Sequence, residues 1–337
     1  MNKTLNITIA TMVGLSCAQA ACAQESSATT GSVMTGTTAA PNVAANTPDF
    51  SARHNGLTIN GAVGNPLFPT AQIPARGSWR IQGSYYDMGN LDNVKNDSSF
   101  DENFGDMSFY GLHAAGRPWT TPLEVSIGVE KLRARGRNVY NAGDFSDDVE
   151  FNDLDKAGIA VGAKYLFTRE TDPLGLRIAG GAGFSQALLK NVHAYLVGTK
   201  SFQTGRRTIT THLGVRYDRF KFTGNIDESD GTTRLDIPFE DTSGKVSLYG
   251  GVEVPLDRRG QWNFVGEAGT RNSEFDFKFF PNLNGKGYEN SSGQLTGKFP
   301  YSLSLRYANQ GWSASAGVMR QGLVNDSGFF AQLGKTF

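Results

Sequence analysis

The sequence ends in the stretch DSGFFAQLGKTF, residues 326–337. Taking every second residue back from the end collects one face, which is mostly apolar: Phe337, Lys335, Leu333, Ala331 and Phe329. The other face is mixed and carries Thr336, Gly334, Gln332 and Phe330. Alternate residues of a β-strand point to opposite sides, so the stretch predicts a strand with one apolar and one mixed side. The wall of a transmembrane β-barrel requires such strands.

A strand that ends on an aromatic residue resembles the C-terminal signature of bacterial outer-membrane β-barrel proteins, a porin-like group. The resemblance implies that Phe337 acts as an assembly signal for the barrel-assembly machinery. It also implies an outer-membrane location in a Gram-negative-type bacterium, with lipid and lipopolysaccharide as partners. Lys335 departs from the pattern, which places an aromatic or aliphatic residue there. Near the membrane interface its stem can lie on lipid while the amine reaches water.

Composition agrees with a β-rich chain. The 337 residues are 39% hydrophobic with a mean hydropathy of −0.34, which excludes a helical membrane protein. Forty-one glycines and 11% aromatic residues fit many turns and rings at membrane interfaces.

The first 77 residues divide into three segments before the predicted barrel. Residues 1–23 are a predicted secretory signal peptide, with Lys3, an apolar core and small residues for cleavage between Ala20 and Ala23, which implies Sec-type export. Residues 24–55, rich in small polar residues, are a predicted disordered periplasmic leader. Residues 56–77 contain three prolines and are a predicted extended arm that enters the barrel or packs beneath it. The only cysteines, Cys17 and Cys22, precede residue 24, so neither a disulfide framework nor a cysteine metal site is expected.

Residues 78–337 predict an all-β, antiparallel up-and-down barrel of about twelve strands. Period-two segments are clearest at 299–307, 209–217, 246–254 and 123–129, and weaker near Trp79, Met107, Ile159, Leu176, Trp262 and Trp312. Segment 192–200 has no clear apolar side. Every second link is short and four of the others are long (89–106, 135–155, 223–243 and 271–297), which predicts both chain ends in the periplasm. A soluble β-sandwich is the alternative, but outward rows of aromatic residues would face no partner in it.

Charged residues at inward positions are the predicted lumen lining: Arg80, Glu124, Glu130, Lys164, Arg177, Arg216, Lys245, Glu253, Glu267 and Arg306. Adjacent strands predict the pairs Glu130–Lys164 and Glu267–Arg306. Mixed charges can line a water-filled channel or pair and close a narrow lumen, because an unpaired buried charge is costly. Both interpretations stay open, since twelve strands leave room for a modest pore unless loops or the arm fill it.

Acidic residues concentrate in the predicted external loops although 32 acidic and 32 basic residues balance overall. The loops can concentrate cations at a pore mouth, bind divalent ions that bridge lipopolysaccharide phosphates, or simply stay solvated. None has the spacing of a calcium-binding loop, and no metal, cofactor or nucleic-acid site is predicted. The candidates are Asp97, Asp101, Glu102, Asp147, Asp148, Asp227, Glu228 and Asp230.

The chain is not predicted to be an enzyme. A barrel-wall hydrolase needs a serine and a histidine in hydrogen-bond reach, and none of the four histidines has a His-x-Ser neighbour. An autotransporter translocator is a further alternative, but the chain before the barrel offers neither a large passenger nor a helix former.

The arm carries a second resemblance, in Gly64–Asn65–Pro66, Pro69–Thr70–Ala71, Pro74 and Gly77. It is similar to YjbH-like outer-membrane proteins associated with exopolysaccharide export.

The leading expectation for the function of the barrel is passive diffusion of small hydrophilic solutes. The competing expectation is a closed barrel that serves envelope structure, adhesion or polysaccharide export.

Overall fold

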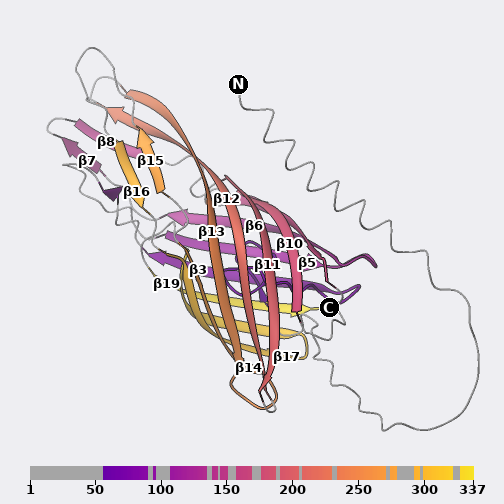
Figure 1. Ribbon diagram of the computed structural model, residues 1–337. Coiled ribbons are helices and arrows are strands. Elements are labelled where there is room, and N and C mark those ends of the chain that lie inside the picture. Colours follow the sequence, from indigo (N-terminus) through magenta and orange to yellow (C-terminus); the bar gives the residue numbers. More distant parts are fainter. Residues whose placement is uncertain are drawn as a thin grey trace, which may run out of the picture. The chain divides into compact units, whose positions relative to one another are not determined.

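The structure is a computed structural model that describes residues 56–89, 94–95, 107–134, 139–142, 145–150, 157–168, 176–186, 190–204, 207–229, 234–270, 274–278, 292–296, 299–321 and 327–337 (Figure 1). The predicted signal peptide and leader lie outside these residues. Among the residues described, no helix is long and apolar enough to cross a membrane.

Twelve antiparallel strands form a closed barrel, as predicted. Each strand pairs with its neighbour along the wall, β11 pairs with β12, and β19 pairs with β3, so the ring has no open edge. The wall strands are β3 (Trp79–Gly89), β5 (Met107–Gly116), β6 (Leu123–Ala134), β9 (Ala157–Leu166), β10 (Leu176–Ser185), β11 (Lys190–Thr204), β12 (Arg207–Ser229), β13 (Arg234–Pro255), β14 (Trp262–Gly269), β17 (Tyr301–Asn309), β18 (Trp312–Arg320) and β19 (Gly328–Thr336).

The first and last wall strands meet through the chain's terminal residue. Phe337 and Trp79 exchange two backbone hydrogen bonds of 3.2 and 2.8 Å. The predicted facing of the last strand is confirmed, because Phe329, Leu333 and Phe337 are exposed on the outside while Phe330 is buried. The Lys335 ammonium lies 4.9 Å from the ring centre of Trp312, so this lysine is accommodated over aromatic faces.

The outer surface of the barrel is an apolar belt between two rows of aromatic side chains. We call the end with the turns after β5, β9, β11, β13 and β17 the short-turn end, and the opposite end the long-link end. The short-turn end carries exposed Trp79, Trp262, Trp312 and Phe337, and the other row includes Tyr110, Tyr217 and Phe329. Exposed aliphatic residues lie between the rows: Leu112, Ile127, Leu196, Leu213, Leu248, Leu303 and Leu333.

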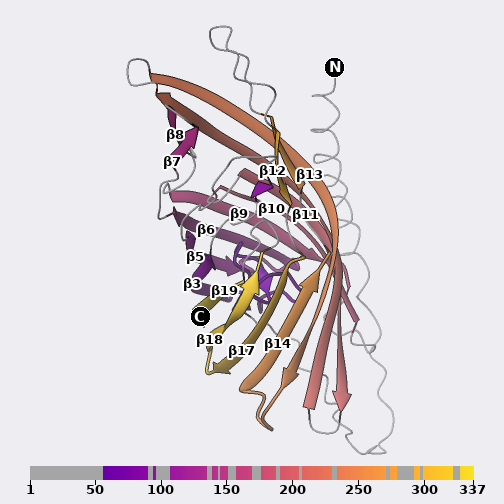
Figure 2. The same ribbon diagram turned by 90° about the vertical axis from the view of Figure 1, so that its left-hand side faces the viewer.

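Strands β12 and β13 continue past the other wall strands at the long-link end (Figure 2). There β12 pairs with β8 (Phe145–Glu150), which pairs with β7 (Val139–Ala142). A separate three-stranded sheet contains β15 (Glu274–Lys278), β16 (Ser292–Thr296) and β4 (Val94–Lys95). The sequence interpretation of 135–155 and 223–243 as loops was therefore wrong for much of both segments. Their acidic side chains hid the strand pattern, since polar alternation gives no apolar face to recognise.

A two-residue turn joins β17 to β18 between the opposed residues Asn309 and Trp312. Gln310 and Gly311 both have positive φ, 48° and 81°. Positive φ at both central positions is the type I′ arrangement, whose twist matches an antiparallel hairpin and which favours Asn-Gly.

Gln310→Asn is expected to raise the free energy of unfolding by up to about 1 kcal/mol, because Asn tolerates left-handed backbone better than Gln. Gly311→Ala is expected to lower it by about 1 kcal/mol or more. Its Cβ would lie 2.9 Å from the Thr336 carbonyl oxygen. Urea unfolding of the refolded barrel measures both changes. A stabilising Gly311→Ala, or a destabilising Gln310→Asn, would contradict this account of the turn.

Candidate functional site: the arm in the barrel lumen

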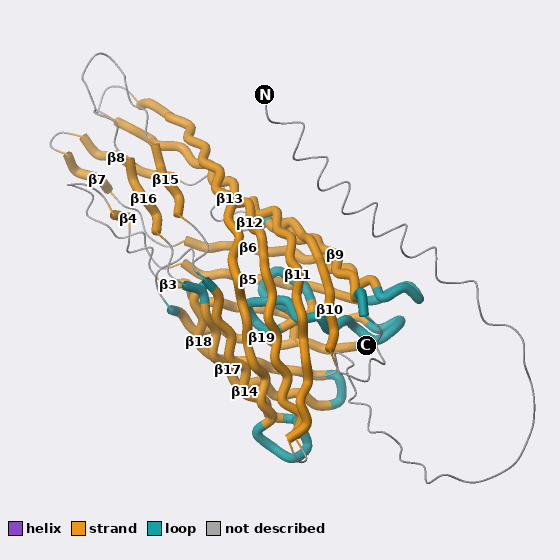
Figure 3. The backbone as a smooth tube through the Cα atoms, in the orientation of Figure 1, coloured by secondary structure: helices purple, strands orange, loops and turns teal. Residues whose placement is uncertain are grey.

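Residues 56–74 of the arm lie inside the barrel (Figure 3). They begin with two short paired strands, β1 (Gly56–Leu57) and β2 (Val63–Gly64), and then follow an irregular path. Prolines suit such a path because each lacks an N–H that would need an acceptor. The apolar side chains are almost fully buried: Leu57, Ile59, Val63, Leu67, Phe68, Ala71 and Ile73.

Wall carboxylates accept hydrogen bonds from the arm backbone. Glu267 on β14 accepts from the N–H groups of Leu67 and Phe68, each at 3.0 Å, and from the Ser302 hydroxyl at 2.7 Å. Glu124 on β6 accepts from the Val63 N–H at 2.8 Å. Apart from the two-residue β1–β2 pair, the arm has no strand ladder to accept its backbone N–H groups, and these side chains supply acceptors.

Wall donors satisfy the arm carbonyls in the same way. Lys164 Nζ donates to the carbonyl oxygens of Val63 and Thr70, at 2.8 and 3.2 Å. Gln82 bonds to both the N–H and the carbonyl oxygen of Leu57, at 2.9 and 2.7 Å. The Tyr249 hydroxyl donates to the Pro69 carbonyl oxygen, and the Gln332 amide donates to the Leu57 carbonyl oxygen. In the opposite direction, the Ala71 N–H donates to the Thr199 hydroxyl oxygen.

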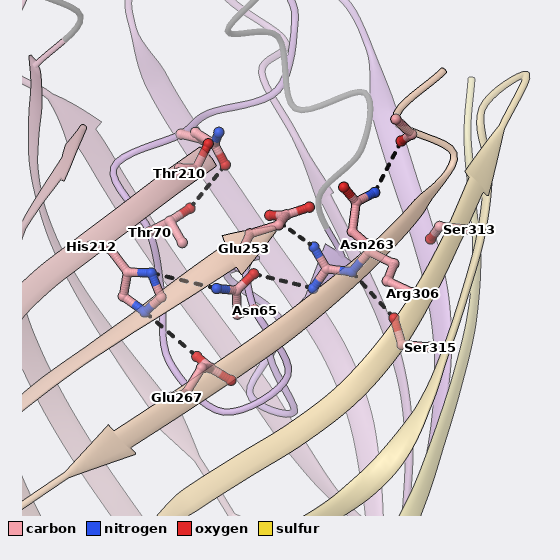
Figure 4. Close-up of polar contacts among 12 residues, drawn as sticks. Asn65, Thr70, Thr210, His212, Glu253, Asn263, Glu267, Arg306, Ser313 and Ser315 are labelled. Atoms are coloured by element: carbon pink, nitrogen blue, oxygen red, sulfur yellow. Dashed lines mark hydrogen bonds and ion pairs between the residues drawn. The ribbon is translucent and has the colours of Figure 1, made fainter. Parts of the chain in front are cut away.

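Asn65 lies at the centre of a polar chain that links the arm to four wall strands, β12, β13, β14 and β17 (Figure 4). Its amide oxygen accepts from Arg306 Nη2 at 3.2 Å, and its amide nitrogen lies 3.5 Å from His212 Nδ1. Arg306 Nη1 lies 3.5 Å from Glu253 Oε2, and His212 Nε2 lies 3.8 Å from Glu267 Oε1. A single arm side chain therefore connects two wall carboxylates through a cation and an imidazole.

The predicted Glu130–Lys164 pair is wrong. The register of β6 and β9 places Glu124 opposite Lys164 and Glu130 opposite Gly158, and the Glu124–Lys164 distance is 2.9 Å. Glu130 instead contacts His113 Nε2 and the Ser185 hydroxyl, both at 2.8 Å. Both glutamates face inward. Because a long link joins β6 to β9, the register of these two strands could not be predicted from the sequence.

The predicted Glu267–Arg306 pair is also wrong. In the register of β14 and β17, Glu267 lies opposite Ser302 and Arg306 lies opposite Asn263. Arg306 pairs with Glu253 across β14, while Glu267 binds the arm. The prediction assumed that wall charges meet each other, whereas an occupied lumen offers backbone groups as partners.

The other predicted lumen residues also occupy inward positions. Arg216 binds the Asp218 carboxylate through Nε and Nη2, at 2.7 to 2.9 Å. Arg80 and Arg177 are buried, and Lys245 is half-buried opposite Asp218 in the register of β12 and β13.

The structure does not gather the acidic candidates in one described site. Asp147 and Asp148 lie on β8, and Asp227 and Glu228 lie on β12 opposite them in register. Asp97, Asp101, Glu102 and Asp230 lie outside the described residues. Within the described ranges, no group of three or more His, Cys, Asp and Glu residues is placed to hold a metal ion.

Of the two placements expected for the arm, inside the barrel or beneath it, the structure shows the first for residues 56–74. Sequence reasoning missed the contacts that hold the arm there, and with them Asn65, His212, Thr199, Tyr249 and Ser302. The alternation of β12 does point His212 inward, but nothing in a strand pattern indicates what lies opposite. Glu130 lies between His113 and Ser185 and contacts both, which differs from the serine-to-histidine contact that a hydrolase uses.

Solved barrels resemble the structure at low identity. The KdgM porin matches with a TM-score of 0.37 and 10% identity, over 77% of this chain and 98% of that one. The translocator domain of the autotransporter NalP from Neisseria meningitidis matches with 0.39 and 13%, over 77% and 88%. The β domain of the Bordetella autotransporter BrkA matches with 0.35 and 13%, over 77% and 99%. The sequence matches no protein-family model and no curated protein.

Proposed function

We propose that this chain is an outer-membrane barrel closed by its own N-terminal arm, which passes small hydrophilic solutes when the arm leaves the lumen. One observation carries the proposal: residues 56–74 occupy a lumen whose wall is polar and charged. The proposed channel differs from the passive channel expected from the sequence, because it opens only when a stimulus displaces the arm.

The outer surface supports the membrane location. An aliphatic belt between two rows of aromatic side chains matches a bilayer core with its two interfaces. A barrel in water would expose this belt at a large cost in free energy. The short-turn end, where the arm joins β3, corresponds to the periplasmic side of such barrels.

The contacts between arm and wall support a closed resting state. Each neutral hydrogen bond contributes about 0.5–1.5 kcal/mol, and those to charged groups contribute about 1.5–3 kcal/mol. Burial of Leu57, Leu67, Phe68 and Ile73 adds about 1.5–3 kcal/mol each. Ordering the arm costs about 1–2 kcal/mol of conformational entropy per residue, and these contacts offset that cost while the arm is docked. A ligand or partner that weakens the contacts is therefore expected to open the barrel.

The chemistry of the wall supports passage rather than permanent closure. Replacing a buried ion pair with packed apolar residues is often neutral or stabilising, so closure alone does not require Glu124, Lys164 and Arg306. These side chains would be well hydrated in a lumen freed of the arm. A permanently closed barrel for envelope structure or export is the second candidate. It is favoured by the apolar part of the arm, where Phe68 stacks on Tyr249 with ring centres 4.6 Å apart.

Single-channel conductance in a planar bilayer tests the proposal. Residues 24–337 are expected to be nearly silent. A variant that lacks residues 24–73 as well as the signal peptide, and so has no docked arm, is expected to conduct steadily. A variant lacking only residues 24–55 is the control and should stay silent, because it keeps the arm. A folded but silent arm-deleted barrel would overturn the proposal in favour of permanent closure. Equal conductance of all three would show that the arm is no plug.

A further inference from the structure

Arg80 is a buried cation without a carboxylate partner in the described part of the chain. The residue is 2% exposed, and its Nη1 donates to the Thr336 hydroxyl at 3.2 Å. Its Nη2 contacts the Ser313 hydroxyl, and its Nε has no acceptor. Neutral hydroxyls compensate a buried guanidinium poorly, because removing a charge from water costs several kcal/mol. The fold alone gives no reason for a charge at this position.

A second guanidinium lies beside Arg80. Arg306 Nε donates to the Ser315 hydroxyl at 3.3 Å, and Arg80 binds Ser313 on the same strand. Residues two apart on a strand share a face and lie about 7 Å apart, so the two guanidinium groups are neighbours. They are close enough to repel each other electrostatically.

Four hydroxyl groups lie on the same side of the lumen as the two arginines. Ser304 lies two residues before Arg306 on the same inward face, and its buried hydroxyl has no hydrogen-bond partner among the described residues. Ser313, Ser315 and Thr336 contact the two cations, and all four hydroxyl groups can donate to an oxygen. Two guanidinium forks with flanking hydroxyls are the donor set that recognises carboxylate and phosphate oxygens.

We infer that Arg80, Arg306 and these four hydroxyls form a binding site for an anionic solute that carries a carboxylate or phosphate group. The inference rests on the proposed function, because the site lies in the lumen that the solute is proposed to cross. It names the chemical class of the solute, which the acidic residues at the long-link end do not indicate.

The site also couples the solute to the arm. Arg306 Nη2 donates to the Asn65 amide oxygen at 3.2 Å. A charged oxygen is a stronger acceptor than an amide oxygen, so a bound anion competes with Asn65 for Arg306. Anion binding therefore weakens one contact that holds the arm, and an arm that is loosened by other means should raise the affinity for the anion.

Thermal unfolding of residues 24–337 tests the site. The chain is titrated with inorganic phosphate or with succinate at constant ionic strength, and tryptophan fluorescence is the readout, since Trp79 and Trp312 directly precede Arg80 and Ser313. At least one anion is expected to raise the unfolding midpoint, and which one does so distinguishes phosphate from carboxylate recognition. Arg80→Gln is expected to weaken the apparent affinity about tenfold or more, because it removes a charged donor.

Arg177→Gln is the matched control, since it removes another buried lumen cation from β10, on a different part of the wall. It should leave the anion response unchanged. An unchanged midpoint with both anions, or an equal response in Arg80→Gln, would overturn the site. If the response is lost in Arg80→Gln but the arm-deleted barrel is silent, the proposed function fails and the site stands. If the arm-deleted barrel conducts without any anion response, only the site fails.

Discussion

Glu267→Ala is expected to release the arm from the lumen. The carboxylate accepts two arm N–H groups at 3.0 Å each, and alanine would leave both donors buried without an acceptor. Each unsatisfied buried donor costs about 1–3 kcal/mol, and the two together shift the equilibrium between docked and released arm by about 30- to 10⁴-fold. Open-channel events in a planar bilayer should become more frequent by about the same factor.

Glu130→Ala is the control for this experiment. Glu130 is also an inward, buried glutamate, but it contacts His113 and Ser185 rather than the arm. Glu267→Gln should fall between the two, because its amide oxygen still accepts while its amide nitrogen does not. If Glu267→Ala opens no more often than Glu130→Ala, the carboxylate does not hold the arm.

Thiol labelling gives a second readout of arm release. Residues 24–337 contain no cysteine, so a single Ala71→Cys substitution marks the arm uniquely. Ala71 is fully buried in the docked arm. Labelling should be faster in the Glu267→Ala background than in the Glu130→Ala background.

Single replacements in the Glu124–Lys164 pair are expected to destabilise the barrel by about 3–5 kcal/mol each, because each leaves an uncompensated buried charge. The two groups are 2.9 Å apart and both are almost fully buried. The double variant Glu124→Leu with Lys164→Met should lose much less than the sum of the single losses, since no charge remains. Urea unfolding of the four proteins gives the coupling energy, expected to be a few kcal/mol.

The double variant is still expected to lose some free energy of unfolding, because it also loses hydrogen bonds to the arm. Glu124 accepts the Val63 N–H, and Lys164 donates to two arm carbonyls, so the arm loses three hydrogen bonds. A control pair, Arg216→Met with Asp218→Leu, removes a bidentate ion pair between two wall residues. Additive losses at Glu124 and Lys164 would show that water already compensates both charges in the closed barrel.

The barrel wall was predictable because alternation is a local property. In a strand such as 123–129, every apolar residue is separated from the next apolar residue by one residue that points inward. Spacing alone therefore predicts the outward face, the inward charges and the approximate ends of the strand. The turn at Gln310 and Gly311 and the short links after β5 and β9 are likewise readable from neighbouring residues.

Partners across the lumen were not predictable, because they depend on contacts between distant residues. Glu124 and Glu130 differ by six positions on one face, and the register after a long link selects which of them meets Lys164. Glu267 lies about 200 residues from the arm backbone that it binds. The chain's local pattern thus determines a closed wall with charges inside, since strand pleat and backbone pairing are short-range. Three-dimensional packing decides that the arm fills the lumen and that Arg80 meets no carboxylate within the described ranges, since hydrogen bonds and ion pairs form between whichever groups the closed ring brings together.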